Sequence, residues 1–220
     1  FKIAICYEEL ILDEIPTDDA KTLELWQSGM TEGIFQFDAP FVQQTLRKMH
    51  PTSFLEISAL NALNRPGPIA FTPQFIARMH GEEKIEYVHP KAEPILKETY
   101  GIIVYQEQVM QLTRALAGFT RGESDTVRKA MGKKKVEIME QQKEIFVYGG
   151  INDATGLPVD GAIKRGVPEN IAIKIYDDMK PFARYAFNKS HAAAYAVLAY
   201  QTAYLKKYYP NQFLTSILNN

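Results

Sequence analysis

The sequence predicts a mainly α-helical protein with minor β structure. Apolar residues recur every three or four positions along most of the chain, which is the spacing of amphipathic helices. Ser, Thr, Asp or Pro precedes several of these runs, and Gly or Pro follows them, as at helix starts and ends. Strand-like alternation is limited to short stretches at 33–37 and 149–166. The 220 residues suffice for one large domain or two small ones.

The first part of the chain combines predicted helices with one predicted strand. Residues 1–12 form an apolar run that we interpret as a helix, and Pro16 marks the boundary that follows it. Leu23 and Trp26 share one face of the next short helix. Residues 33–37 alternate as a strand does.

Two further helices flank a rigid loop. Pro40 suits the first turn of one helix, and Ser53 with Glu56 forms the capping-box pattern of a helix over 53–63. Two prolines around a glycine then make residues 64–68 an irregular loop that presents Arg65 at a fixed place.

The rest of the chain is predicted to be helical apart from one insertion. Residues 100–105 suit either a buried strand or the lead-in to a helix. Gly132 is expected to lie just beyond the end of a short helix, and Pro181 to end or kink the helix that Pro168 starts. Residues 149–166 are turn-rich and predict an inserted surface β-hairpin. The expected helices in this part cover 72–80, 106–118, 136–148, 168–180 and 190–208, with a last one from 211.

Composition excludes several classes of protein. Cys6 is the single cysteine, so the chain can form neither an intrachain disulfide nor a cysteine-based zinc site. No apolar run approaches the roughly 18 residues that a membrane helix needs, and no secretory signal pattern is present. The single cysteine fits a reducing cytosol, so we expect a cytoplasmic protein. Because the chain begins at Phe1 without Met, we expect it to be a piece of a longer protein.

The stretch 128–135 is strongly basic in a nearly neutral chain. Residues 121–135 hold six Lys or Arg against Glu123 and Asp125, whereas the whole chain has a formal charge of −1. Clustered cations of this kind indicate a surface that binds polyanions. The alternative is a solvated basic helix end that offsets the negative end of the helix dipole.

A second candidate site lies at 187–195. Asn188 or Ser190 can cap a helix whose first turn has free N–H groups, and Lys189 and His191 stand beside that end. Three small alanines follow, so another backbone or a flat ring can approach closely. Phosphate sites are built in this way at helix N-termini. The alternative is an ordinary capped helix with alanines chosen for their helix propensity.

The carboxylates do not suggest a catalytic or metal centre. The pair at 18–19 is interpreted as a helix cap, and the pair at 177–178 as part of an exposed helix face. The polar residues 105–108 are expected to cap and position a helix start. We identify no Gly-rich phosphate loop, Ser/His/Asp set or Cys nucleophile in the sequence. The residues therefore indicate a place for an anionic substrate without a complete catalytic centre.

Several long motifs, in this order, resemble the alpha subunit of bacterial DNA polymerase III, a C-family replicative polymerase. The similarity is to the shorter type of alpha subunit, which lacks a proofreading domain. It implies a multi-helix polymerase fingers domain over 15–220, with 1–14 as the end of the palm and its connection to the fingers. The motifs are Ile15-Pro16-Thr17-Asp18-Asp19, Gly33-Ile34-Phe35-Gln36, Asn64-Arg65-Pro66-Gly67-Pro68, Thr99-Tyr100-Gly101-Ile102-Ile103-Val104-Tyr105-Gln106-Glu107-Gln108-Val109-Met110, Arg128-Lys129-Ala130-Met131-Gly132-Lys133-Lys134-Lys135 and Phe187-Asn188-Lys189-Ser190-His191-Ala192-Ala193-Ala194-Tyr195.

The resemblance also implies a function and a set of site residues. The fingers would bind the triphosphate of an incoming dNTP for template-directed DNA synthesis, while Mg²⁺ would be held by palm aspartates outside this chain, so the chain alone would be inactive. The implied partners are the DNA primer-template and, through parts outside this chain, other subunits of the replicative holoenzyme at the nucleoid. The implied phosphate contacts are Arg128, Lys129, Asn188, Lys189, Ser190 and His191, supported by Arg65, Lys133, Lys134 and Lys135.

Two departures and two alternatives accompany this prediction. The family often has a second Arg where this chain has Lys129, and Lys cannot make the bidentate contact that Arg makes with phosphate. The insertion at 149–166 is longer than in many relatives, and we assign it no role. A non-enzymatic nucleic-acid-binding module would instead show salt-dependent DNA binding without a nucleotide response. A protein–protein scaffold would show neither response.

Overall fold

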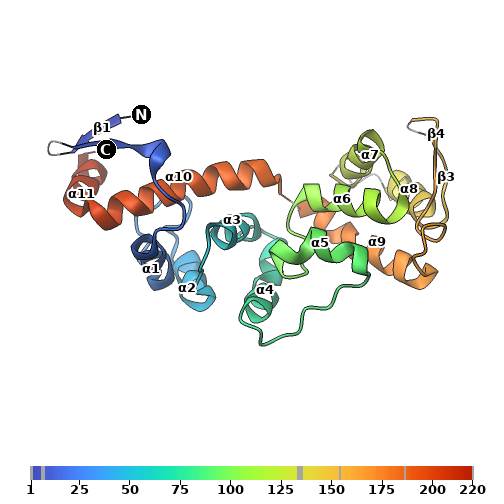
Figure 1. The fold of residues 1–220 in the computed structure, drawn as a ribbon, viewed down its shortest axis with the longest axis horizontal. Coiled ribbons are helices and arrows are strands. Elements are labelled where there is room, and N and C mark those ends of the chain that lie inside the picture. The colour runs from blue at the N-terminus through green and yellow to red at the C-terminus, as the bar shows by residue number, and fades with distance from the viewer. Residues whose placement is uncertain (1, 6–7, 133–135, 154, 186, 220) are drawn as a thin grey trace. The chain divides into compact units, whose positions relative to one another are not determined.

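Figure 1 shows the fold in the computed structural model, which describes all residues except 1, 6–7, 133–135, 154, 186 and 220. Residues 2–5, 8–9, 131–132, 136 and 181–185 are described by their backbone alone. The described residues are mainly helical, with 11 α-helices and two small antiparallel sheets, which confirms the predicted fold class. The chain divides into two compact units, residues 1–61 with 190–220 and residues 62–189.

The first unit begins with a β-hairpin, so the prediction of a helix over 1–12 is wrong. Strands β1 (Lys2–Ile5) and β2 (Glu8–Ile11) pair antiparallel, with Ile3 opposite Leu10. β-branched residues alternate at positions 3 and 5, and such residues favour a pleated strand over a helix. A 3₁₀ turn, η1 (Leu12–Glu14), then leads out of the hairpin.

Helix α1 (Ala20–Ser28) follows and has the predicted cap. The Asp19 carboxylate accepts a hydrogen bond of 2.8 Å from the Thr22 backbone N–H, which is the geometry of an N-cap. The interpretation of the pair at 18–19 as a helix cap is therefore confirmed for Asp19.

Residues 33–37 form consecutive turns, so the predicted strand is absent from this described segment. Gly33 and Gln36 both have positive φ, at 73° and 64°. Ile34 and Phe37 are buried while Phe35 is 45% exposed, so the apolar side chains point inward at a spacing of three residues. Alternation over five residues was too short to distinguish this turn pattern from a strand.

The core of the first unit forms around Trp26. Its ring lies edge-on to Phe37 at 4.8 Å and is stacked on Tyr200 at 6.5 Å. The capping box is confirmed, since Ser53 N donates to Glu56 Oε2 at 3.1 Å. The helices of this unit are α1, α2 (Pro40–Met49), most of α3 (Phe54–Leu63), most of α10 (Lys189–Tyr208) and α11 (Pro210–Asn219).

The second unit is a helical assembly around one apolar cluster. Helices α6 and α7 pack together, and α9 packs against both α7 and α8 (Figure 1). Val109, Leu116, Phe146 and Tyr176 lie in the buried cluster between them. The elements are η2 (Pro68–Phe71), α4 (Thr72–Met79), η3 (Pro90–Ala92), α5 (Glu93–Leu96), η4 (Lys97–Thr99), α6 (Gln106–Ala117), α7 (Arg121–Gly132), α8 (Val136–Tyr148) and α9 (Glu169–Tyr185).

Two expected helix ends differ from the structure. Gly132 is the last residue of α7, so it does not lie beyond the helix as predicted. Pro181 lies inside α9, which continues to Tyr185. A proline removes one backbone N–H donor, and a helix of 17 residues can continue past it despite that loss, so only the predicted end at Pro181 is wrong and the predicted kink stays a prediction.

The insertion at 149–166 contains the predicted hairpin. Strands β3 (Gly150–Asn152) and β4 (Leu157–Val159) pair antiparallel, with Ile151 opposite Pro158. Gly149 and Gly161 meet at its base, because a Cβ added to Gly161 would lie 2.2 Å from the backbone nitrogen of Gly149. Both glycines also have φ near 80°, so side chains are excluded by space and by backbone conformation.

Candidate functional site

Two basic residues in the second half of α7 share one carboxylate. Arg128 lies 2.7 Å and Lys129 lies 2.6 Å from the Asp125 carboxylate. Hydrogen bonds from Lys129 and Arg128 lower the pKa of Asp125 below its ordinary value of 3.8. Arg128 also donates to Gln106 Oε1 at 3.4 Å, which links α7 to the first residue of α6.

The chain before α10 runs alongside the chain before α6. Tyr105 and Phe187 form a parallel β-bridge. Phe187 N donates to Val104 O at 3.2 Å, and Gln106 N donates to Phe187 O at 2.9 Å. Apart from this single bridge at Tyr105, residues 100–105 contain no strand, so of the two alternatives that the sequence left open the structure supports the lead-in to α6.

A carboxylate from α6 binds the start of α10. Glu107 accepts hydrogen bonds of 2.9 Å from the Asn188 side-chain amide and from the Lys189 backbone N–H. The Lys189 ammonium lies 2.6 Å from the Glu98 carboxylate. An anion therefore does bind the start of this helix, as its free N–H groups and dipole predict, but here the anion belongs to the protein.

Gln108 holds the start of α6 in place. Its Oε1 accepts from Val104 N at 2.8 Å and from Tyr105 N at 3.0 Å, and its Nε2 donates to Thr99 Oγ1 at 2.8 Å. Gln108 is fully buried. The prediction that residues 105–108 cap and position a helix start is confirmed for this residue.

Arg65 joins the same region through an aromatic ring. Its guanidinium carbon lies 3.4 Å from the centre of the Phe187 ring, which is close cation–π contact. Burial lowers the pKa of Arg65, although an Arg side chain stays charged at neutral pH. The segment around the start of α6 therefore connects four of the sequence-predicted residues, Arg65, Arg128, Asn188 and Lys189. We call this set, together with Lys129, the α6-start cluster.

The remaining predicted residues lie elsewhere along the chain. Ser190 and His191 continue α10 and belong to the first unit, where both are exposed and the His191 ring lies 4.1 Å from the Tyr195 ring. Lys133, Lys134 and Lys135 fall outside the described residues.

Sequence patterns alone missed the partners of these cations. Asp125 could have been found, because a carboxylate three and four residues before Arg128 and Lys129 suits ion pairs along a helix. Glu98 and Glu107 precede Lys189 by 91 and 82 residues, so no local pattern could pair them.

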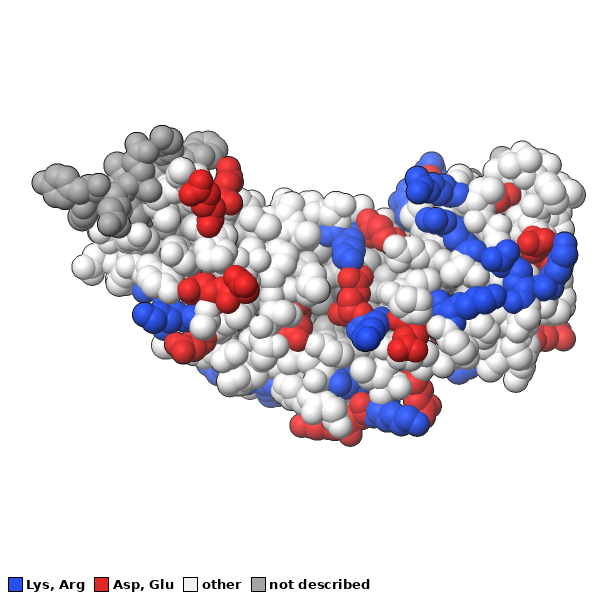
Figure 2. Space-filling view, viewed as in Figure 1, with Lys and Arg blue, Asp and Glu red and all other residues white. Residues whose placement is uncertain are grey.

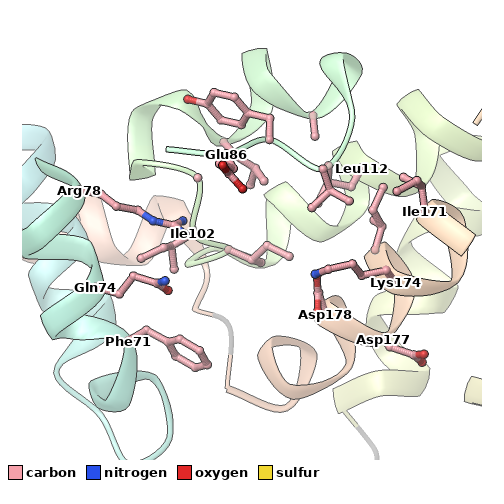
Figure 3. Close-up of a pocket in the computed structure, with 17 residues that line it drawn as sticks. Phe71, Gln74, Arg78, Glu86, Ile102, Leu112, Ile171, Lys174, Asp177 and Asp178 are labelled. Atoms are coloured by element: carbon pink, nitrogen blue, oxygen red, sulfur yellow. The ribbon is translucent and has the colours of Figure 1, made fainter. Parts of the chain in front are cut away.

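A cavity of about 610 Å³ lies elsewhere in the second unit (Figure 3). Its interior is apolar, with Ile102, Leu112 and Ile171, and none of the predicted site residues lines it. The charged groups at its edge already have partners, since Lys174 pairs with Asp178 at 2.7 Å. The cavity offers space for an apolar group but contains no nucleophile or acid–base pair that would suggest a reaction.

The described residues include no group of three His, Cys, Asp or Glu side chains that could hold a metal ion. Within the same part of the chain, no helix is both long enough and apolar enough to cross a membrane. The interpretation of residues 177–178 as an exposed helix face is confirmed, since their side chains are 43% and 47% exposed and ion-paired with lysines.

Comparisons with known proteins agree with the resemblance in the motifs. The family described as bacterial DNA polymerase III alpha subunit finger domain matches residues 5–154. Proteins named DNA polymerase III subunit alpha are similar over most of the chain: that of Aquifex aeolicus is 46% identical over 202 residues (91% of this chain, 16% of the relative). That of Thermus aquaticus is 46% identical over 216 residues (96% and 17%), and that of Chlamydia trachomatis is 48% identical over 204 residues (93% and 16%).

The chain thus spans about a sixth of the length of these curated relatives. The matched residues 5–154 are more than half of the 220, and they include Arg65, Gln106 and Arg128. The chain belongs to the finger-domain family of the bacterial DNA polymerase III alpha subunit.

Proposed function

We propose that this chain binds the triphosphate of an incoming dNTP during template-directed DNA synthesis, as the fingers part of a DNA-directed DNA polymerase. The observation that carries the proposal is the α6-start cluster, in which Gln106 contacts both the Arg128 side chain and the backbone of Phe187. Through these contacts, two basic elements about 60 residues apart in sequence are tied to one helix start. A triphosphate presents several negative oxygens, and such a cluster of cations suits it.

The cluster would contribute charge stabilisation and positioning. Negative charge spreads over the phosphoryl oxygens during nucleotidyl transfer, and fixed cations stabilise that charge. Asp125, Glu98 and Glu107 keep the cations in place before a nucleotide arrives. When a triphosphate binds, its oxygens would take over some of these contacts.

The rest of the polymerase is part of the proposal. We assign Ser190 and His191 to the nucleotide contact through their place directly after Lys189 in α10. We assign the catalytic Mg²⁺ to aspartates outside this chain, as the resemblance to the C-family polymerases implies. Residues 1–14 would then be the end of the palm and 15–220 the fingers. DNA primer-template and other replicative subunits would be the partners, in the bacterial cytoplasm at the nucleoid.

Arg128→Ala in the full-length subunit tests this function. We expect a higher KM for dNTP and a lower kcat, together equal to about 2–4 kcal/mol of transition-state stabilisation. The matched control is Arg121→Ala, an exposed Arg at the start of the same helix, which should leave both constants within about twofold. An unchanged kcat/KM for Arg128→Ala would remove this residue from the site. Salt-dependent DNA binding without any nucleotide response would instead favour a non-enzymatic nucleic-acid-binding module.

A further inference from the structure

A second set of cations lies toward the other end of α6, in the same unit. Arg114 is in the last turn of α6, about 12 Å along the helix axis from Gln106 at 1.5 Å per residue. The Arg165 side chain lies across the end of this helix, because a Cβ added to Gly118 would be 3.1 Å from its Nη1 atom. Lys91 donates to the Arg165 carbonyl oxygen at 2.9 Å. We call Lys91, Arg114, Lys164 and Arg165 the α6 basic surface.

Two of these four side chains line a shallow groove of about 510 Å³. Arg114 and Arg165 line it together with Gln111 and Gly118. Figure 2 shows Lys and Arg side chains forming a band over the part of this unit where α5 and α6 lie. The surface is therefore a solvent-open strip of cations with a groove between two guanidinium groups.

The α6 basic surface has few counter-charges, unlike the α6-start cluster. Asp160 is shared between Lys164 at 2.8 Å and Arg165 at 3.3 Å. Within the part of the chain that the structure describes, the Arg114 guanidinium forms no ion pair or hydrogen bond. Four cations against one carboxylate leave an excess of three positive charges, on a chain whose total is −1. Such an excess attracts a polyanion.

We propose that the α6 basic surface binds the sugar–phosphate backbone of DNA, as a contact separate from the nucleotide cluster. Guanidinium groups can bind phosphate oxygens through paired hydrogen bonds, and two of them face this groove. Phe119, the aromatic residue among those that line it, is only 3% exposed, so a base has no platform for stacking there. The contact is therefore with the backbone and independent of base sequence. The proposal rests on the proposed function in taking DNA as the polyanion, and an acidic protein is the competing partner.

Salt-dependent DNA binding by the full-length subunit tests the proposal. The variant is Arg114→Gln with Arg165→Gln, and anisotropy of labelled single-stranded and duplex DNA is followed over a range of salt concentrations. We expect roughly tenfold to thirtyfold weaker binding near physiological salt, and a salt slope smaller by about two. If only single-stranded or only duplex DNA binds more weakly, the surface binds that form of DNA. Weaker binding of either form supports the proposal.

The control variant is Lys84→Gln with Lys174→Gln, whose side chains are 86% and 58% exposed elsewhere in the same unit. DNA affinity and salt slope should be unchanged in this control. An equal loss in both variants would show a general charge effect and would overturn the proposal. So would an unchanged salt slope in the arginine variant. In the arginine variant, the KM for nucleotide at saturating DNA should stay within twofold of the unchanged subunit. Failure of the proposed function would instead appear as an unchanged kcat/KM in Arg128→Ala.

Photo-crosslinking gives a second measurement that does not depend on removing charge. A photoreactive amino acid replaces Gln111, which lines the groove and is exposed, and Glu82 is the exposed control position. We expect crosslinks to DNA from position 111 and none from position 82. Crosslinks from position 111 to another protein, without DNA, would support an acidic protein partner and refute the proposal.

Discussion

Glu107→Ala should loosen the first turn of α10, because it removes the acceptor for two hydrogen bonds. The Asn188 amide and the Lys189 backbone N–H each donate to this carboxylate at 2.9 Å. A hydrogen bond to a charged group contributes about 1.5–3 kcal/mol when it is well shielded from water. Here Asn188 is exposed and Lys189 is partly exposed, so we expect about 1–2 kcal/mol for the pair together.

Hydrogen–deuterium exchange of the full-length subunit measures this loss. The Lys189 amide is itself one of the two donors, so its exchange reports directly on the bond. A loss of about 1–2 kcal/mol corresponds to roughly fivefold to thirtyfold faster exchange in peptides that cover 187–195. Amides near the middle of α10 should be unaffected, because the helix hydrogen bonds there do not involve Glu107.

Glu98→Gln is the matched control for that prediction. It removes the ion pair with the Lys189 ammonium at 2.6 Å but leaves the Lys189 backbone N–H bonded to Glu107. Because that ion pair is 31–40% exposed, we expect less than a twofold change in exchange. Unchanged exchange in Glu107→Ala would refute the inference that this carboxylate holds the start of α10. Equal acceleration in both variants would show that general charge, rather than the bond, controls the turn.

Two further predictions concern stability of the 220-residue chain. Lys129 and Arg128 lower the pKa of Asp125, so the ionised Asp125 carboxylate should stabilise the folded chain above pH 3.8. This stabilisation should be lost as the pH falls through the lower pKa of the folded state. Asp125→Asn should remove this part of the acid sensitivity, which urea unfolding between pH 6 and 3 measures. Trp26→Ala should lower the free energy of unfolding by about 3–5 kcal/mol, and Trp26→Phe by less than about 2, because the buried indole N–H has no acceptor among the described residues.

Controls separate these effects from general damage. An NMR titration should give a carboxyl pKa below 3.8 for Asp125, and a value at or above it would contradict the ion-pair geometry. For Trp26, equal losses in the Phe and Ala variants would contradict the inference that packing of the ring supplies most of its contribution. Circular dichroism before unfolding checks that each variant keeps its helices.

The fold was predictable where local signals agree with packing. Ser53 and Glu56 cap the predicted helix, and α8 has the predicted bounds of 136–148. The errors occurred in short apolar runs, where the spacing of apolar residues does not distinguish a helix from a strand or a turn. Residues 1–12 suit a helix by composition, but they pair as two strands, and pairing is a non-local property. Residues 33–37 were too few to separate a strand from turns that bury every third side chain.

The cations of the candidate site are visible in the sequence, but their partners in the structure are not. Lys and Arg runs are visible in sequence, and so is the anion-binding potential of a helix start. The β-bridge between Tyr105 and Phe187 joins two segments of the second unit that lie far apart in the chain. No spacing rule predicts such a bridge, and the carboxylates that depend on it were missed for the same reason.

The two groups of cations differ in how they are neutralised, and this difference indicates different uses. Arg128, Lys129 and Lys189 are each within 2.7 Å of a carboxylate, so they are fixed in position without a ligand. Fixed charges suit a step in which a small anion must be oriented, because little reorganisation is then required. Arg114 has no such partner among the described residues, so its charge stays available to a mobile polyanion that needs attraction rather than exact placement. Nucleotide KM should therefore respond to the first group, and the salt dependence of DNA binding to the second.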